Sequence, residues 1–144
     1  MFDSEIHALQ NIIVRNEQVS RVLEFGALNG FSTVNMAMAI NFARKEGSIV
    51  TVDIFQKDKE RDDELLFDKN CAAYQVVNRI EKIKGYSSDR RVTRALTGRK
   101  FDLIFHDAEH QYHPVLRDII IYEPFLNISG YFVFHDYVEK WTLK

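Results

Sequence analysis

Histidine and acidic residues gather in the run His-Asp-Ala-Glu-His, residues 106–110, which directly follows an apolar segment. His135 and Asp136 follow a second apolar segment in the same way. If both segments are neighbouring parallel strands, their carboxyl ends lie side by side, and the carboxylates of Asp107 and Asp136 can converge. Two carboxylates suit a hard divalent ion such as Mg²⁺, which takes oxygen ligands. The pattern therefore predicts a divalent metal site.

Four of the five histidines lie in this part of the chain: His106, His110, His113 and His135. A histidine side chain titrates near neutral pH, so it can accept a proton during catalysis. One alternative is a metal hydrolase that uses His106, Asp107, His110 and His135. The spacing of these residues matches no known zinc signature, which argues against that alternative.

A strand, a glycine turn and a helix start follow one another in residues 21–32, Arg-Val-Leu-Glu-Phe-Gly-Ala-Leu-Asn-Gly-Phe-Ser. Gly26 and Gly30 allow the backbone to turn tightly and to approach a ligand. The helix that we expect to open at Ser32 presents N–H groups and partial positive charge, which suit a carboxylate or a phosphate. The spacing is neither that of a dinucleotide site nor that of a phosphate loop. It predicts a site for a nucleotide-like ligand.

Two acidic residues accompany this turn. Asp53 closes the next apolar run, about twenty residues further on, where a carboxylate can accept hydrogen bonds from both hydroxyls of a ribose. The alternative for Asp53 is a helix cap or an acid in a solvated loop. Glu24, just before the first glycine, either orients the turn or meets an amino group of the ligand, and a purely structural role is equally open.

The pattern Glu24-x-Gly26-x-x-x-Gly30-x-Ser32 resembles the class I S-adenosylmethionine-dependent methyltransferases, especially the catechol- and caffeoyl-CoA-type O-methyltransferases. The run Phe-Asp-Leu-Ile-Phe-His-Asp-Ala-Glu-His is similar to the branch with sugar O-methyltransferases and cephalosporin-hydroxylase-like proteins. The resemblance covers residues 20–137. It implies that the chain transfers a methyl group from S-adenosylmethionine to a hydroxyl of a small molecule, assisted by a divalent metal.

The resemblance also assigns roles. The implied cofactor-binding residues are Glu24, Gly26, Ala27, Gly30, Ser32, Asp53, Ser87 and Asp107. Ser32 would meet the methionine carboxylate, with an N-cap, alone or in addition, as its alternative role, and Ser87 would meet the adenine, although ordinary turn chemistry explains Ser87 equally well. In the metal-dependent relatives, acids at the positions of Asp107 and Asp136 hold Mg²⁺, and the ion acidifies the acceptor hydroxyls.

Two histidines complete the implied site. The sugar-modifying branch usually has a second acid where this chain has His135, so His135 as a metal ligand leaves room for Mn²⁺, Fe²⁺ or Zn²⁺ in place of Mg²⁺. His110 stands where the family places its general base, and we expect it to take the acceptor proton.

Apolar periodicity predicts an alternation of helices and strands. We expect helices over 3–17, 32–45, 65–77, 89–98 and 114–124, and strands over 22–25, 49–53, 80–83, 101–105 and 131–134. Such alternation is typical of an α/β, Rossmann-like, doubly wound parallel sheet, and the resemblance implies the strand order 3-2-1-4-5. We further expect Gly47 to cap the second helix and Val115, Leu116, Ile119 and Ile120 to face the core.

The bulk composition predicts one domain over 1–144, with an N-terminal helix in 1–18 and a core in 20–137. Apolar residues make up 46% and charged residues 28% of the chain, as in ordinary globular proteins. A net charge of −2 offers no basic field for nucleic acid. The uncharged stretch 25–43 contains too many Gly, Asn, Ser and Thr residues for a membrane span. With no signal peptide visible and a single cysteine, Cys71, we expect a cytoplasmic protein.

The family usually adds another helix and an antiparallel hairpin after the fifth strand, whereas only 138–144 follow it here. We therefore expect the hairpin to be missing and the strand 131–134 to be an exposed edge, which a second copy in a homo-oligomer could cover. The alternative to an enzyme acting on a small hydroxylated acceptor is a non-catalytic or partner-dependent methyltransferase-like module that binds the nucleoside ligand.

Overall fold

The computed structural model describes residues 3–135 of the chain. Its strands are β1 (Arg21–Phe25), β2 (Ser48–Asp53), β3 (Ile80–Lys84), β4 (Phe101–His106) and β5 (Leu126–Phe134). Its helices are α1 (Asp3–Arg15), α2 (Phe31–Phe42), α3 (Asp63–Ala73), α4 (Arg90–Leu96) and α5 (Tyr112–Tyr122), with short 3₁₀ turns at η1 (Val77–Arg79) and η2 (Glu123–Phe125).

The five strands form one sheet in the order β3-β2-β1-β4-β5, and every strand pair in residues 3–135 is parallel. The predicted fold class and strand order are therefore confirmed. The order reverses between β1 and β4, where successive helices cross to opposite faces of the sheet. A parallel sheet of this kind leaves a crevice outside the carboxyl ends of its strands at that point.

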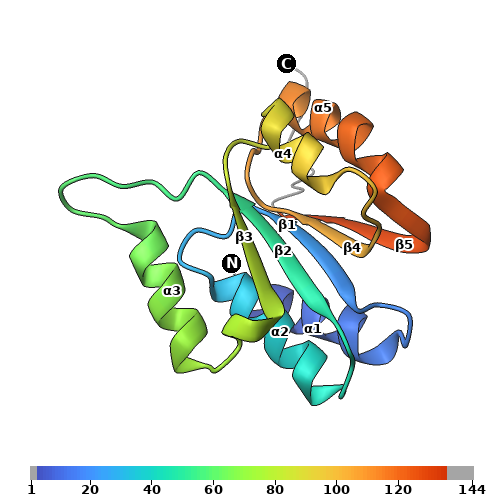
Figure 1. Cartoon of the computed structure of the whole chain (residues 1–144). Helices are drawn as coiled ribbons and strands as arrows, with labels where there is room; N and C mark the ends of the chain where they lie inside the picture. The colour runs from blue at the N-terminus through green and yellow to red at the C-terminus, as the bar shows by residue number, and fades with distance from the viewer. Residues whose placement is uncertain (1–2, 136–144) are drawn as a thin grey trace.

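Helices cover both faces of the sheet, with α1 and α2 on one side and α4 and α5 on the other (Figure 1). Alternate residues of β1 serve the two layers: Val22 packs with α1 and α2, whereas Leu23 packs with α4 and α5. Because both faces are buried, the central strands have nearly continuous apolar sequences, and this made them visible in the sequence.

Helix α2 ends earlier than predicted. Its C-cap is Ala43, and Arg44 adopts a left-handed conformation with φ 55°, so Gly47 is not the cap. Glycine is required at position 47 for another reason, because a Cβ atom there would collide with the backbone of Ser20, the residue before β1. The close approach of two chain segments, rather than helix termination, therefore explains this glycine.

The prediction for the buried face of α5 was wrong in part. Leu116 and Ile120 are 38% and 66% exposed, whereas Asp118 and Tyr122 on the same helix are fully buried. The helix is rotated so that Asp118 reaches His106 at the end of β4. The carboxylate of Asp118 is hydrogen-bonded at this buried position, so its burial leaves no unsatisfied acceptor there.

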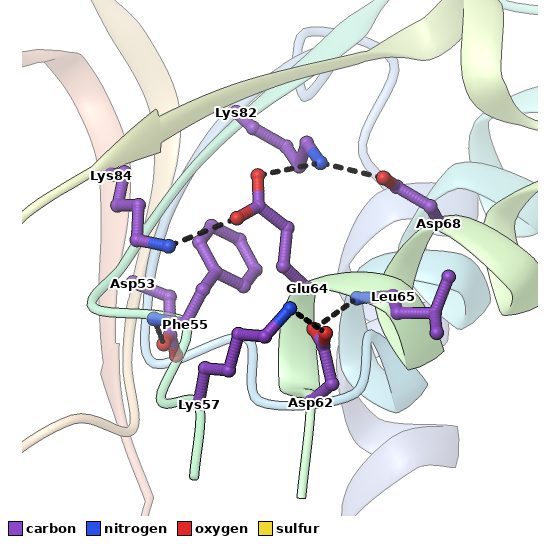
Figure 2. A network of polar contacts seen from close by, with 9 residues as sticks. All are labelled: Asp53, Phe55, Lys57, Asp62, Glu64, Leu65, Asp68, Lys82 and Lys84. Atoms are coloured by element: carbon purple, nitrogen blue, oxygen red, sulfur yellow. Dashed lines mark hydrogen bonds and ion pairs between the residues drawn. The ribbon is translucent and has the colours of Figure 1, made fainter.

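Helix α3 projects at the β3 side of the sheet, and ion pairs join it to β3 (Figure 1, Figure 2). Lys82 of β3 contacts Glu64 and Asp68 of α3, and Lys84 contacts Glu64 at 2.9 Å. Asp62 caps the helix by accepting a hydrogen bond from the backbone N–H of Leu65. These contacts fix the end of the β2–α3 connection, which borders the cavity described next.

None of the helices in the described part of the chain is both long enough and apolar enough to cross a membrane. The sheet has no antiparallel strand between residues 3 and 135. The missing hairpin was predicted from residues beyond this range. The single-domain organisation over 1–144 stays a prediction.

Candidate cofactor and active site

A cavity of about 470 Å³ opens at the carboxyl ends of the strands. Each strand contributes to its lining: Gly26 follows β1, Asp53 ends β2, Ser87 follows β3, Asp107 follows β4 and His135 follows β5. This is the position at which open parallel sheets bind their ligands. All five strand ends thus border one crevice, whereas the predicted convergence of Asp107 with Asp136 involves a residue outside the described range.

The glycine turn after β1 lies against the loop after β4. Gly26 has a φ of 90°, and a Cβ atom there would lie 2.6 Å from the carbonyl carbon of Asp107 and 2.8 Å from the nitrogen of Ala108. The N–H of Asp107 in turn donates to the carbonyl of Phe25 at 2.8 Å. Only glycine fits this position, because it combines a left-handed backbone with contact to another main chain.

Helix α2 begins one residue before Ser32. Its N-cap is Gly30 with a φ of 84°, and no side chain caps it, so Ser32 is not the N-cap. The hydroxyl groups of Ser32 and Thr33 both donate to the carboxylate of Glu24, which is fully buried beneath the turn. This pattern favours the structural role of Glu24, since the carboxylate joins β1 to the first turn of α2.

Burial raises the pKa of Glu24 from 4.5 to about 7, although hydrogen bonds from Ser32 and Thr33 lower it. The unfolded chain loses this proton near pH 4.5, whereas the folded chain keeps it until about pH 7. The contribution of this group to stability is therefore fully present below pH 4.5 and is lost as the pH rises through 7.

We expect the Glu24→Gln variant to lack the loss of stability that the wild type shows as the pH rises from 4.5 through 7. Relative to the wild type, its free energy of unfolding should rise by on the order of 3 kcal/mol across this pH window, because each pKa unit corresponds to about 1.4 kcal/mol. Urea unfolding of both proteins at a series of pH values measures the difference. Parallel pH profiles of the two proteins would contradict a buried, proton-retaining Glu24.

Asp53 holds two loops together at the cavity. Its Oδ2 accepts a hydrogen bond from the N–H of Leu28 in the glycine turn at 2.9 Å, and its Oδ1 accepts one from the N–H of Phe55 at 2.6 Å. A carboxylate has about four acceptor positions, so each oxygen retains capacity for a further donor. Asp53 can therefore both brace the loops and accept hydrogen bonds from a ligand.

Asp107 and His135 contact each other across the ends of β4 and β5. Oδ1 of Asp107 lies 3.0 Å from Nδ1 of His135, and Nε2 of His135 lies 3.1 Å from Oε2 of Glu5 in α1. Within residues 3–135, no group of three or more His, Cys, Asp or Glu side chains could hold a metal ion. The third predicted ligand, Asp136, lies outside the described residues. Two of the three residues predicted to bind the metal, Asp107 and His135, thus contact each other.

The predicted site residues divide into two groups. Those that line the cavity are Gly26, Asp53, Ser87, Asp107, His110 and His135. Those that do not line it are Glu24, Ala27, Gly30 and Ser32. Members of the second group form the turn or lie beneath it, where they shape the backbone that faces the cavity. The ligand roles of both groups stay predictions.

The sequence reasoning missed a buried polar network behind the Ser87 side of the cavity. Nε2 of His106 lies 2.9 Å from Oδ2 of Asp118, and Nε of Arg117 donates to Oδ1 of Asp118 at 2.9 Å. Arg117 also donates to the hydroxyl of Ser87 at 3.2 Å, and the hydroxyl of Tyr122 donates to the carbonyl of Ser87. The one feature of the sequence that could have indicated this network is Asp118, an acidic residue between the apolar residues of the helix.

Asp118 is ionised within this network. Burial alone would raise the pKa of Asp118, but hydrogen bonds from His106, Ser87 and Arg117 hold it below its ordinary value. The carboxylate is completely inaccessible to solvent, whereas Arg117 is partly exposed and lines the cavity. The buried carboxylate of Asp118 thus holds the guanidinium of Arg117 in position at the cavity.

Known proteins with similar sequences or structures identify the family to which this fold belongs. A family model described as a methyltransferase domain matches residues 23–137. The catechol O-methyltransferase of Mycobacterium tuberculosis is 35% identical over 94 residues, which are 65% of this chain and 38% of that protein.

Two solved structures share the fold. A cofactor-bound protein from MTB superimposes with a TM-score of 0.76 and 24% identity over 93% of this chain and 56% of its own. The O-methyltransferase TomG from Streptomyces achromogenes, involved in tomaymycin synthesis and in complex with SAM, has a TM-score of 0.72 and 18% identity over 93% of this chain and 56% of its own. The chain thus spans little more than half of either structure. On the match to residues 23–137, the chain belongs to the family of methyltransferase domains.

Proposed function

We propose that the chain binds S-adenosylmethionine in the strand-end cavity and transfers its methyl group to a hydroxyl of a small molecule. The observation that carries this proposal is that Gly26, Asp53, Ser87 and Asp107 line one cavity at the point where the strand order reverses. A nucleoside ligand needs acceptors for its ribose hydroxyls and a close backbone approach for its charged end. Asp53 and the glycine turn supply these two features.

The order of these groups along the sheet edge orients the cofactor. Asp53 accepts the ribose hydroxyls, the Ser87 loop receives the base, and the methionine part lies along the turn at Gly26. The reactive methyl group then lies toward β4, where Asp107 and His110 line the cavity. The sulfonium is already activated, so the chain has to hold the donor carbon and the acceptor oxygen in line.

His110 takes the acceptor proton in this proposal. It is exposed at the cavity, three residues after Asp107, and a neutral imidazole has a ring nitrogen that can accept a proton. A divalent ion, Mg²⁺ or another, would acidify the acceptor hydroxyl. Among the described residues, the predicted ligands Asp107 and His135 contact each other, and no group of three or more His, Cys, Asp or Glu side chains could hold the ion. Metal assistance stays a prediction, which activity measurements with and without a chelator test.

Replacing His110 by alanine should lower the rate constant for methyl transfer about 100-fold, because general base catalysis typically contributes that much or more. The affinity for S-adenosylmethionine should stay unchanged. Mass spectrometry of a panel of hydroxylated acceptors gives the rate, and calorimetry gives the affinity. His113→Ala is the matched control, since His113 is exposed and outside the cavity lining. Equal rates for both variants would contradict the role of His110.

A second candidate function is a methyltransferase-like module that binds the nucleoside but depends on a partner for turnover. The chain spans 38% of its curated relative and 56% of the two structures, so the activity of those complete proteins is only a proposal for this chain. Cofactor binding without methylation of any acceptor is its expected signature. The acceptor class, a cytoplasmic location, the lack of a nucleic-acid partner and a second copy at β5 stay predictions.

A further inference from the structure

Arg117 faces the cavity from α5 with its guanidinium already fixed from behind. Nε and Nη2 both bond to Oδ1 of Asp118, at 2.9 and 2.8 Å, and Nη2 also reaches the hydroxyl of Ser87. The Arg117 side chain is 40% exposed, whereas that of Asp118 is fully buried. Among the described residues, Nη1 has no hydrogen-bond partner, so it is the guanidinium nitrogen available to a ligand in the cavity.

The pairing with Asp118 changes what this arginine can recognise. Its positive charge is neutralised by an adjacent carboxylate, so the site attracts an anion less strongly than an isolated arginine would. The planar guanidinium still presents N–H groups in a fixed direction, because two of its nitrogens are held. A neutral acceptor atom at a defined position suits such a group. The other oxygen of Asp118 is held by His106 from β4, which fixes the carboxylate itself.

The location of Arg117 indicates which part of the ligand it meets. Ser87 lies in the loop after β3, which also contributes Gly85, Tyr86 and Ser88 to the cavity. With the ribose on Asp53, this loop surrounds the base. We propose that Arg117 donates a hydrogen bond from Nη1 to a ring nitrogen of the purine, and that Asp118 is the residue that positions it. This inference rests on the proposed function.

The test measures whether the contribution of Arg117 to ligand affinity requires one particular nitrogen of the purine. The ligands are S-adenosylhomocysteine and its three analogues in which N1, N3 or N7 of the purine is replaced by CH. One analogue should bind the wild type about ten-fold more weakly than the parent compound, as expected for loss of a hydrogen bond from a charged donor. In Arg117→Met, the parent compound should lose about ten-fold in affinity and the penalty for that analogue should vanish.

Three further variants separate the ligand contact from folding. Arg117→Lys keeps the charge beside Asp118 but cannot hold Asp118 and the purine together, so the penalty for the analogue should also vanish. Asp118→Asn should reduce the penalty although Arg117 is present, because the guanidinium is no longer held by a carboxylate. Arg94→Met, at an exposed site on α4 outside the cavity lining, should behave as the wild type. Urea unfolding identifies any variant that is not folded.

The outcomes are distinct. Equal binding of all four ligands by the wild type would overturn the inference and leave the proposed function in place. A uniform loss of affinity in Arg117→Met and Arg117→Lys, with the penalty for the analogue unchanged, would overturn it in the same way, because a merely structural role affects all ligands alike. Failure of the wild type to bind S-adenosylhomocysteine at all would overturn both the inference and the proposed function.

Discussion

Replacing Asp53 by alanine is expected to lower the affinity for S-adenosylmethionine by at least about 100-fold. In the proposed complex, the carboxylate accepts hydrogen bonds from both ribose hydroxyls, each of which contributes about 1.5 kcal/mol or more. The same carboxylate holds the N–H groups of Leu28 and Phe55, so its removal also loosens the two loops that border the cavity. Calorimetric titration of the two proteins measures the change.

Asp58→Ala is the matched control for Asp53. Asp58 lies in the same connection between β2 and α3 and also accepts backbone hydrogen bonds, from Glu60 and Arg61, but it does not line the cavity. If loop bracing alone were responsible, both variants would weaken binding to a similar degree. An Asp53→Ala protein that binds as tightly as the Asp58→Ala protein would exclude Asp53 as the ribose acceptor.

Gly26→Ala should be the most damaging single substitution in the glycine turn. The new Cβ atom would overlap the backbone of Asp107 and Ala108, and the residue would keep a φ of 90°, which alanine adopts only at a cost. Overpacking against main chain and the left-handed backbone together should lower the free energy of unfolding by on the order of 4 kcal/mol or more. Urea unfolding and cofactor titration should both show the loss.

Substitution of Gly98 distinguishes the cost of the left-handed backbone from the cost of the steric overlap. Its φ is 81°, close to that of Gly26, but a Cβ atom there would meet no heavy atom within 4 Å. Gly98→Ala should therefore cost only the backbone term, about 1 to 2 kcal/mol, and leave cofactor binding unchanged. Equal destabilisation by the two variants would show that the contact between the turn and the β4 loop is not what requires glycine at position 26.

The strands were predictable from the sequence because a doubly covered parallel sheet buries both faces of its central strands. Val22, Leu23 and Phe25 of β1 and the run from Phe101 to Phe105 in β4 are all buried, and they form apolar segments that are interrupted only by Glu24 and Asp102. The strand order was different, since it came from the resemblance to methyltransferases. Helix faces were harder to predict, and the buried face of α5 was predicted incorrectly in part.

In the candidate site, too, the residues at strand ends were predictable from the sequence, whereas a residue on a helix was not. Gly26, Asp53 and Asp107 were recognisable because each ends or follows an apolar strand, and parallel strands bring such positions to one edge. Arg117 could not be found in this way, because its approach to the cavity depends on the rotation of α5. The same orientation of α5 brings Asp118 to His106, a contact that joins residues twelve positions apart and has no sequence signature.

A crystal structure of the chain grown with S-adenosylhomocysteine tests the central claim most directly. The account predicts the ligand in the strand-end cavity, with its ribose hydroxyls on the carboxylate of Asp53, its homocysteine part along the turn at Gly26 and its purine against the Ser87 loop. A ligand bound elsewhere, or a cavity that stays empty at ligand concentrations far above the micromolar range, would contradict it.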